Sequence, residues 1–386
     1  MKFFMDFAAG SLNKYGEELC GDKVEFISEA DGFIAVLSDG LGSGVKANIL
    51  ATLTSKIAIT MLKEGLPIED VVDTIIHTLP ICSVRKLAYS TFTIIKVNQE
   101  GMVYIVEFDN PSIFFMREGK IQSLEKETRE INGRIIHESH FKLQQKDTLV
   151  FVSDGVIHAG VGMVLNLGWS WKEVAQYLQS LGVEDLPAKK ITSLLLGVCE
   201  DLYIEKPGDD TTVATIKVTE PKLATLFSGP PCDKNQDSIV VEELMQTKGK
   251  KIVCGGTAAN IVSRELGREV TTSFNIIDPR IPPIGHIKGI DLVTEGVLTI
   301  QGAVEKLEQV KVSKDLDFLY QEDGASLLAR MLFEECTHLK ILIGRAINPA
   351  HQNPDFPNAL SIKLNILHRL EEVLTSLGKI VSVVYY

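Results

Sequence analysis

The sequence predicts an α+β protein with two domains: an α+β domain over residues 1–218 and a smaller α/β domain, with a mainly parallel sheet, over residues 238–386. Three observations lead to this expectation. A chain of 386 residues is too long for one ordinary hydrophobic core. Strands and helices occur in blocks in the first part of the chain and alternate in the second. Residues 219–237, rich in proline, glycine and polar side chains, read as a linker.

In the first domain, the spacing of apolar residues predicts the order of elements. Short runs of β-branched and aromatic residues over 24–40 and 90–124, divided by turn signals such as Asn110-Pro111, predict an antiparallel meander. Between these runs, apolar residues at helical spacing over 45–65 and over 67–79 predict two helices. The remaining elements are a strand over 147–156, a helical region over 171–197 and a closing strand over 211–218.

In the second domain, strand and helix alternate. The segment 248–270 predicts a strand, a Gly-Gly turn and a helix that starts near Thr257, and the segment 289–310 repeats this scheme. A helix over 323–339 leads into a strand over 340–348, and a final helix and strand follow over 359–386. This order predicts a small parallel α/β layer.

Composition excludes several classes of function. A net charge of -12 and a pI near 5.3 argue against a general nucleic-acid binder. The six cysteines show no CxxC pair and read as reduced thiols. The N-terminus lacks an adequate signal-peptide core, and no later window is expected to reach a membrane span. We expect a soluble protein of the cytoplasm that binds no nucleic acid and no membrane.

Five aspartates lie at predicted strand ends or edges: Asp22, Asp39, Asp154, Asp209 and Asp210. Each could be a simple turn residue, because aspartate and glycine are common in turns. Two apolar strands that both end in Ser-Asp-Gly, however, indicate a shared rim of acids. Magnesium and manganese prefer several oxygen ligands. A glycine beside each acid is expected to let water, a metal ion or a backbone carbonyl approach closely.

The segments "SDGLGSGVKAN", "FVSDGV" and "GDDTTVATIKV", in this order, resemble the metal-dependent serine/threonine protein phosphatases of the PPM family, in particular the branch of stage II sporulation protein E. The resemblance covers about residues 1–218 and implies a β-sandwich flanked by helices. It also implies two Mn²⁺ or Mg²⁺ ions that activate a water for hydrolysis of phosphoserine or phosphothreonine. The substrate would be a phosphorylated protein, for which an anti-sigma-antagonist-like protein is a candidate.

The resemblance assigns catalytic and metal-binding roles to individual positions. Asp39 would bridge the two metals, and the carbonyl of Gly40 and the carboxylate of Asp22 would serve the second. Asp154 and Asp209 would hold the first metal. Asp210 matches a position near the site that holds asparagine or aspartate.

Two departures from the family pattern concern the surroundings of this site. The meander reads "EFDNPSIFF" where many relatives have a Gly-His or Gly-Asn-Pro-Pro turn, which predicts a changed loop. After the second Ser-Asp-Gly, the chain places His158, which could be a ligand, a proton donor or a surface residue. The aromatic residues of the meander, Phe108, Phe114 and Phe115, are expected to belong to the core.

The second domain offers a candidate site for a small anionic ligand. Gly255 and Gly256 would expose backbone N–H groups at the start of a helix beside Thr257, and Arg345 follows a later strand. The alternatives are a plain Gly-Gly connection and a surface arginine. Oligomerisation is also possible for this domain.

Two functions therefore remain open at this point. One is a phosphatase whose C-terminal domain controls it through the helices near residues 45–65. The other is a signalling protein with a catalytically weak or inactive phosphatase domain, which acts through its C-terminal site.

Overall fold

The computed structural model describes residues 3–29, 32–78, 90–272, 284–313, 316–346 and 359–386, without the side chains of 29, 272, 312 and 359–361. The contacts between residues divide the chain into two compact units, Met1–Glu220 and Pro221–Tyr386. Each unit has its own sheets and its own hydrophobic cores. Of the cysteines, Cys82 lies outside the described residues, and Cys20, Cys199, Cys232, Cys254 and Cys336 carry free thiols.

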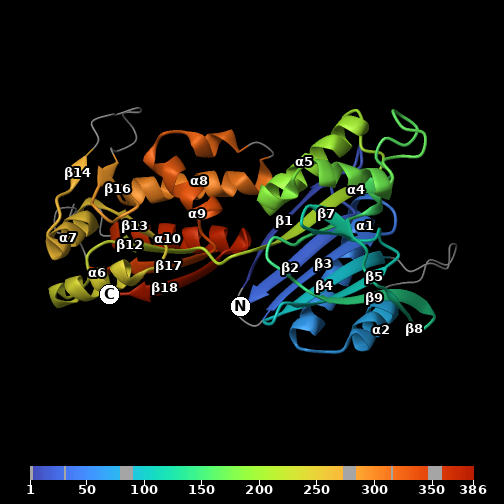
Figure 1. The fold of residues 1–386 in the computed structure, drawn as a ribbon, viewed down its shortest axis with the longest axis horizontal. Helices are drawn as coiled ribbons and strands as arrows, with labels where there is room; N and C mark the ends of the chain where they lie inside the picture. The colour runs from blue at the N-terminus through green and yellow to red at the C-terminus, as the bar shows by residue number, and fades with distance from the viewer. Residues whose placement is uncertain (1–2, 30–31, 79–89, 273–283, 314–315, 347–358) are drawn as a thin grey trace. The chain divides into compact units, whose positions relative to one another are not determined.

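The first unit contains two antiparallel sheets that pack face to face (Figure 1). The five-stranded sheet has the order β1-β11-β10-β6-β7, with bounds Phe4–Leu12, Thr211–Thr219, Thr148–Val152, Phe114–Arg117 and Lys120–Gln122. The six-stranded sheet has the order β2-β3-β4-β5-β9-β8, with bounds Asp22–Glu29, Gly32–Gly40, Ser90–Asn98, Met102–Phe108, Arg134–Lys142 and Glu127–Ile131. One core cluster takes residues from both sheets, which makes the pair a β-sandwich.

Strand β3 shows how this layering follows from the sequence. Successive side chains of a strand point to opposite faces. Phe33 and Leu37 accordingly belong to the core between the sheets, whereas Ile34 and Val36 belong to a second core beneath two helices. Because both faces of β3 are covered, its residues 33–38 are apolar or small and almost fully buried.

Helices cover both outer faces of the sandwich. The helices α1 (Gly44–Lys63) and α2 (Ile68–Thr78) pack on the six-stranded sheet. The short α3 (Asp154–Ile157), α4 (Trp171–Ser180), the 3-10 turn η1 (Val183–Asp185) and α5 (Ala188–Leu202) pack on the five-stranded sheet. The predicted β-sandwich flanked by helices is therefore confirmed. The structure adds β1 and the β8–β9 hairpin, for which the sequence analysis predicted no strand.

The aromatic residues of the meander lie in these cores, as expected. Phe108, Phe114 and Phe115 are buried. Asn110 ties the turn between β5 and β6 to strand β4: its side chain accepts a hydrogen bond from Thr91 and donates one to Thr93. The altered turn is thus a well-anchored connection in the fold.

Helix α1 departs from one expectation of the sequence analysis. By length and composition alone, it is long and apolar enough to cross a membrane. In the structure, 44% of its most apolar window is buried inside the protein. Core helices of soluble proteins pass the same test, so the property by itself assigns no location to the chain.

The second unit is built on a seven-stranded sheet with the order β14-β15-β16-β13-β12-β17-β18. The bounds are Thr271–Thr272, Gly285–His286, Leu292–Thr294, Lys250–Cys254, Leu223–Ser228, His338–Ile343 and Ile380–Tyr385. The five strands from β16 to β18 are parallel, and β14 and β15 pair antiparallel at one edge. The predicted mainly parallel sheet is confirmed.

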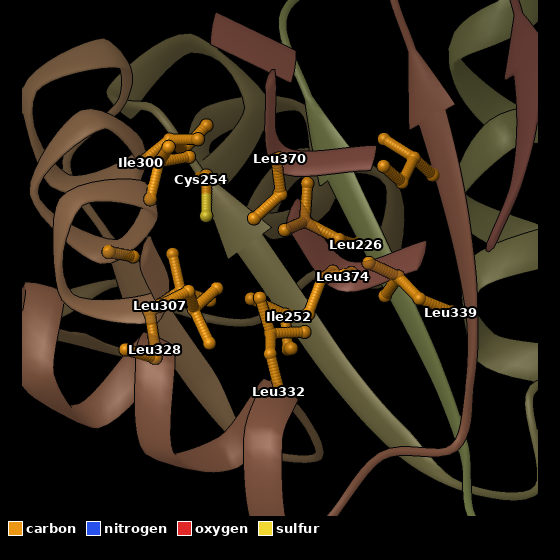
Figure 2. Close-up of a cluster of buried hydrophobic side chains, with 14 of the residues drawn as sticks. Leu226, Ile252, Cys254, Ile300, Leu307, Leu328, Leu332, Leu339, Leu370 and Leu374 are labelled. Carbon is orange, nitrogen blue, oxygen red and sulfur yellow. The ribbon is translucent and has the colours of Figure 1, made fainter. Parts of the chain in front are cut away.

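Helices cover both faces of this sheet as well. One core joins the sheet to α8 (Val297–Val312), α9 (Gly324–Glu334) and α10 (Ala359–Ser376), and Figure 2 shows its leucine and isoleucine side chains around Cys254. The other core joins the sheet to α6 (Asp237–Gln246) and α7 (Gly256–Leu266). The 3-10 turns η2 (Lys234–Gln236) and η3 (Asp317–Tyr320) precede α6 and α9.

The predicted linker 219–237 is wrong. Its residues 223–228 form β12, which lies between β13 and β17 in the middle of the sheet. The run "LATLFS" has the length and apolar character of a buried strand, and five of its six residues are buried. The prolines and glycines on either side of it made the whole segment resemble a linker.

Candidate metal centre

The pleat of three strands directs three aspartates toward the space between the two sheets. In β3, Asp39 continues the inward series of Phe33, Ala35 and Leu37. In β2, Asp22 continues the series of Val24 and Phe26, which pack against the same core. These two aspartates are direct partners across the β2–β3 ladder. Two carboxylates in directly opposite positions repel each other.

Asp210 approaches the same place from the opposite sheet. It precedes β11 and lies in the same alternating series as Ala214, Ile216 and Val218, which face the core between the sheets. Asp22 and Asp210 are each only 4% exposed. Acids from both sheets thus meet at one end of the sandwich.

Asp154 and Asp209 form the more open part of this acidic cluster. Asp154 is the first residue of α3, directly after β10 and its N-cap Ser153. Asp209 has a side chain that is 46% exposed. His158, at the C-terminal end of α3, is exposed. The predicted acids are therefore brought together at one rim.

The serines of the two Ser-Asp-Gly segments have a structural role. Ser38 and Ser90 share a hydrogen bond of 2.5 Å between their hydroxyls, and Ser90 donates a second one to the carbonyl of Asp39 at 2.9 Å. The hydroxyl of Ser153 accepts a hydrogen bond from the N–H of Thr212 at 2.9 Å. Each serine links the strand that carries an acid to the neighbouring strand, which fixes the position of the acid.

The glycines beside the acids serve close packing of the backbone. A Cβ on Gly40 would overlap the carbonyl of Ala47 in α1, and one on Gly155 would overlap the carbonyl of Asp210. A Cβ on Gly21 would lie 2.7 Å from Oδ2 of Asp210. Of the three alternatives expected beside these glycines, the close approach of a backbone carbonyl is the one that the structure shows at Gly40 and Gly155.

Helix α1 holds the two acid-bearing strand ends from one side. Asn48 donates a hydrogen bond to the carbonyl of Cys20 at 2.8 Å, two residues before Asp22. Ala47, next to it, packs against Gly40 at the end of β3. The second turn of α1 therefore contacts both strands on which Asp22 and Asp39 lie.

The electrostatics of the cluster reflect crowding and burial. Burial raises the pKa of Asp39, and the charges of Asp22 and Asp154 raise it further. Burial is also the main cause of the raised pKa of Asp22. The pKa of Asp154 is raised by burial and then by the charge of Asp209. Asp39 thus lies within the electrostatic reach of the buried acids and of the open ones.

The donor set of this cluster fits a hard divalent cation. Both carboxylate oxygens of Asp22 and Oδ2 of Asp210 are buried without a hydrogen-bond partner among the described residues. Buried charged oxygens are strongly unfavourable unless a cation or donor compensates them. As the side chains stand, no three acidic, histidine or cysteine residues in the described part of the chain are arranged closely enough to hold an ion.

The sequence model for stage II sporulation protein E matches residues 29–219, which include β3, β10, β11 and the acids Asp39, Asp154 and Asp209. Residues 29–219 thus match the stage II sporulation protein E family. This family is a branch of the PPM-type protein phosphatases, as the resemblance of the acid-bearing segments implied. No curated protein sequence matches the chain significantly.

Several solved structures are similar to part of the chain. The phosphatase domain of SpoIIE from Bacillus subtilis has 19% identity, covers 57% of this chain and 94% of its own, and has a TM-score of 0.44. The RsbU and RsbW domains of a Mycobacterium tuberculosis protein have 16% identity, cover 63% and 69%, and have a TM-score of 0.47. RsbX in complex with magnesium has 15% identity, covers 56% and 100%, and has a TM-score of 0.36.

The loop between β1 and β2 adds a residue to the acidic cluster that the sequence analysis missed. The backbone N–H of Lys14 donates a hydrogen bond to Oδ1 of Asp210 at 3.0 Å. The side-chain Nζ of the same lysine lies 3.6 Å from Oδ1 of Asp209. Nothing near Lys14 in the sequence points to this contact, because the aspartates are about two hundred positions further along the chain.

In the second unit, outside the SpoIIE-type domain, the structure separates the predicted ligand residues. Gly255 is the N-cap of α7, with φ 116°, and Gly256 and Thr257 begin the helix. Gly255 also packs against Gly296, the N-cap of α8, so two helix N-termini lie side by side.

Arg345 follows β17, and its guanidinium carbon lies 5.5 Å from the ring centre of Tyr385 in β18. Since β12 separates β13 from β17, the arginine and the glycines belong to different parts of the sheet edge.

The reversal of strand order lies between β12 and β17, one strand away from the predicted glycine turn. The loops that follow these two strands pack tightly, since a Cβ on Gly344 would overlap the backbone of Pro230. Lys363 of α10 donates a hydrogen bond to the carbonyl of Gly344 at 2.5 Å, and burial lowers the pKa of this lysine to about 8. The missed strand β12 is the reason that the sequence analysis did not identify this position.

Proposed function

We propose that the SpoIIE-type domain hydrolyses phosphoserine or phosphothreonine in a partner protein, with two Mn²⁺ or Mg²⁺ ions as cofactors. The observation that carries this proposal is the acidic cluster at one end of the sandwich, in which buried carboxylate oxygens lack hydrogen-bond partners. The protein-phosphatase family of residues 29–219 agrees with it. So does the magnesium bound to RsbX, one of the structurally similar proteins.

The roles of the residues follow from their positions. Asp39, whose pKa is raised by burial and by the charges of the other four acids, would contact both ions. Asp22 and the carbonyl of Gly40 would serve the ion on the buried side, and Asp154 and Asp209 the ion on the open side. Divalent cations held by these residues would supply an activated water and neutralise the charge of a phosphoryl group in an in-line displacement. No serine or cysteine nucleophile is then required.

The test is hydrolysis of p-nitrophenyl phosphate and of a phosphoserine peptide by the full chain. Activity should require Mn²⁺ or Mg²⁺ and should disappear after complete chelation with EDTA. Asp147→Asn is the matched control for asparagine substitutions in the cluster, such as Asp39→Asn. Asp147 is a buried aspartate of the same unit and is paired with Arg117 outside the cluster. Activity that persists after complete chelation would contradict the metal mechanism.

We further propose that the C-terminal unit controls the phosphatase, through a small anionic ligand bound near Gly255, Gly256 and Thr257 or through a partner protein. The N-termini of α7 and α8 lie side by side there, without a side-chain cap hydrogen bond at Gly255 or Gly296 among the described residues, and helix N-termini favour an anion. Arg345 would then act separately, at its own position beside β18.

RsbU and RsbW domains occur among the structurally similar proteins, which agrees with a phosphoprotein substrate of the anti-sigma-antagonist type.

Gly256→Val in the full chain tests this control. No atom lies within 4 Å of a Cβ at Gly256, so the change should disturb the ligand site without a clash. We expect altered turnover of a protein substrate in Gly256→Val and unaltered turnover of p-nitrophenyl phosphate. Arg345→Ala serves as the comparison. The alternative function, an inactive phosphatase-like signalling protein, predicts no hydrolysis by the wild type with any metal.

A further inference from the structure

Lys14 is the basic residue that the structure places against the open side of the acidic cluster. Its position follows from strand pairing. In the β1–β11 ladder, Leu12 is opposite Thr211. Continuing this antiparallel register by two residues brings Lys14 opposite Asp209, where the two side chains form an ion pair at 3.6 Å.

The backbone of Lys14 is held by hydrogen bonds, and its side chain is 38% exposed. Its N–H donates to Asp210, and the N–H of the next residue, Tyr15, donates to the carbonyl of Pro207 at 2.8 Å. The carbonyl of Lys14 accepts from the N–H of Glu17 at 3.0 Å. These bonds attach the β1–β2 loop to the segment that carries Asp209 and Asp210. The lysine therefore stays at the rim while its ammonium group can change partners.

The ion pair with Asp209 is weak enough to be exchanged. The two side chains are 38% and 46% exposed, and exposed ion pairs contribute little because water screens them. In the proposed function, Asp209 gives its charge to a metal ion, which weakens its attraction for the ammonium group. Lys14 would then be a cation at the edge of the site whose ion-pair partner among the described residues, Asp209, is engaged elsewhere.

The substrate supplies such a partner. A phosphoryl group carries two negative charges near neutral pH, and it must approach a rim that contains five carboxylates. A lysine ammonium is a common phosphate-binding group in proteins. We propose that Lys14 binds the phosphoryl group of the substrate, by moving from Asp209 to a phosphoryl oxygen. This inference rests on the proposed function and adds a phosphate-binding residue to it.

The experiment compares Lys14→Met, Lys14→Arg and Lys206→Met in the full chain, all at saturating Mn²⁺. Lys206 is the matched control: it is exposed, its Nζ lies 5.3 Å from the ring centre of Tyr15, and its loss changes the net charge equally. The measurements are kcat and KM for a phosphoserine peptide, the dissociation constant of inorganic phosphate by calorimetry, and the dissociation constant of Mn²⁺.

We expect Lys14→Met to raise KM and the dissociation constant of phosphate by roughly tenfold or more, the effect of losing one charged hydrogen bond. The kcat should stay within about threefold of the wild type, and Lys14→Arg should restore most of the phosphate binding. Binding of Mn²⁺ should be unchanged or tighter, because the ammonium group no longer competes for Asp209. Lys206→Met should behave like the wild type.

Three outcomes would overturn the inference: unchanged phosphate binding in Lys14→Met, weaker Mn²⁺ binding in that variant, or an equal loss of phosphate binding in Lys206→Met. The calorimetric measurement separates the inference from the proposed function. A wild type that hydrolyses nothing but binds phosphate through Lys14 would refute the enzyme and support the phosphate site. A wild type that hydrolyses the peptide while Lys14→Met keeps the wild-type KM would support the enzyme and refute the phosphate site.

Discussion

At the scale of single residues, the acidic cluster combines the proposed metal site with an unfavourable charge arrangement. Asp39 is the clearest case, because burial and the other acids both raise its pKa. The same carboxylate that would bridge two cations therefore destabilises the fold when no cation is bound. Function and stability should respond in opposite directions when its charge is removed.

The first prediction follows for Asp39→Asn. The change keeps the size of the side chain and removes the charge, so turnover of p-nitrophenyl phosphate at saturating Mn²⁺ should fall by at least ~100-fold. The melting temperature of the metal-free protein should stay equal or rise. Retention of more than roughly a tenth of the wild-type turnover, against the ~100-fold loss expected for a principal electrostatic group, would contradict the bridging role.

The second prediction separates the two neighbouring acids before β11. Oδ1 of Asp210 accepts the backbone N–H of Lys14, and an asparagine side-chain oxygen could accept the same bond. We expect Asp210→Asn to keep its turnover within about tenfold of the wild type and Asp209→Asn to lose far more. Turnover at a series of Mn²⁺ concentrations distinguishes them. A larger loss in Asp210→Asn would make Asp210 the metal ligand in place of Asp209.

At the scale of secondary structure elements, the segment from β3 to α1 depends on its glycines for two different reasons. Gly40 has no room for a Cβ, because Ala47 of α1 occupies that space. Gly42 has nothing within 4 Å of a Cβ but adopts φ 109°, which L-residues rarely adopt. The first glycine is required by packing and the second by backbone conformation.

The third prediction uses this difference. Gly40→Ala should lower the free energy of unfolding strongly and weaken Mn²⁺ binding, since either α1 or the end of β3 must move. Gly42→Ala should cost about 1–3 kcal/mol through backbone strain alone, with Mn²⁺ binding preserved in the folded fraction. Denaturant unfolding and Mn²⁺ titration of both variants provide the measurement. Equal losses in the two variants would show that packing against Ala47 is unimportant.

The elements also show how far the sequence determines the site. Apolar runs that end in Ser-Asp-Gly identified Asp39 and Asp154, because strand ends and turn residues are local signals. The contact between Lys14 and Asp209 depends on the pairing of β1 with β11 across most of the first unit, and β1 itself was not predicted. Strand β12 was missed for a related reason: its place in the sheet depends on β13 and β17, which follow it in the chain.

At the scale of the whole molecule, the acidic cluster should make stability depend on pH and on metal. Asp22, Asp39 and Asp154 have raised pKa values in the folded protein. Between the pKa of the unfolded chain, about 4, and the higher folded value, the folded state binds more protons. Their contribution to stability is therefore complete at low pH and is lost as the pH rises through the folded pKa.

The fourth prediction compares melting temperatures between about pH 5 and pH 8, the range above the usual aspartate pKa. Relative to Asp39→Asn, the metal-free wild type should lose stability as the pH rises. Saturating Mn²⁺ should remove this difference between pH values for the wild type, because a bound cation compensates the charges and stabilises the folded state by mass action. A metal-free wild type that gains stability over Asp39→Asn with rising pH would contradict the raised pKa values.

The contact of α1 with both acid-bearing strands has a consequence for local opening of the structure. The amide of Gly40 is bonded to the carbonyl of Gly21 at 3.1 Å, and Ala47 packs against both glycines. This amide can exchange its hydrogen with solvent only when the β2 and β3 ends separate, and that separation must displace the helix. The amide hydrogen of Gly40 should therefore exchange at a rate similar to the amides in the second turn of α1. A change in the exchange rate at one position should be accompanied by a change at the other.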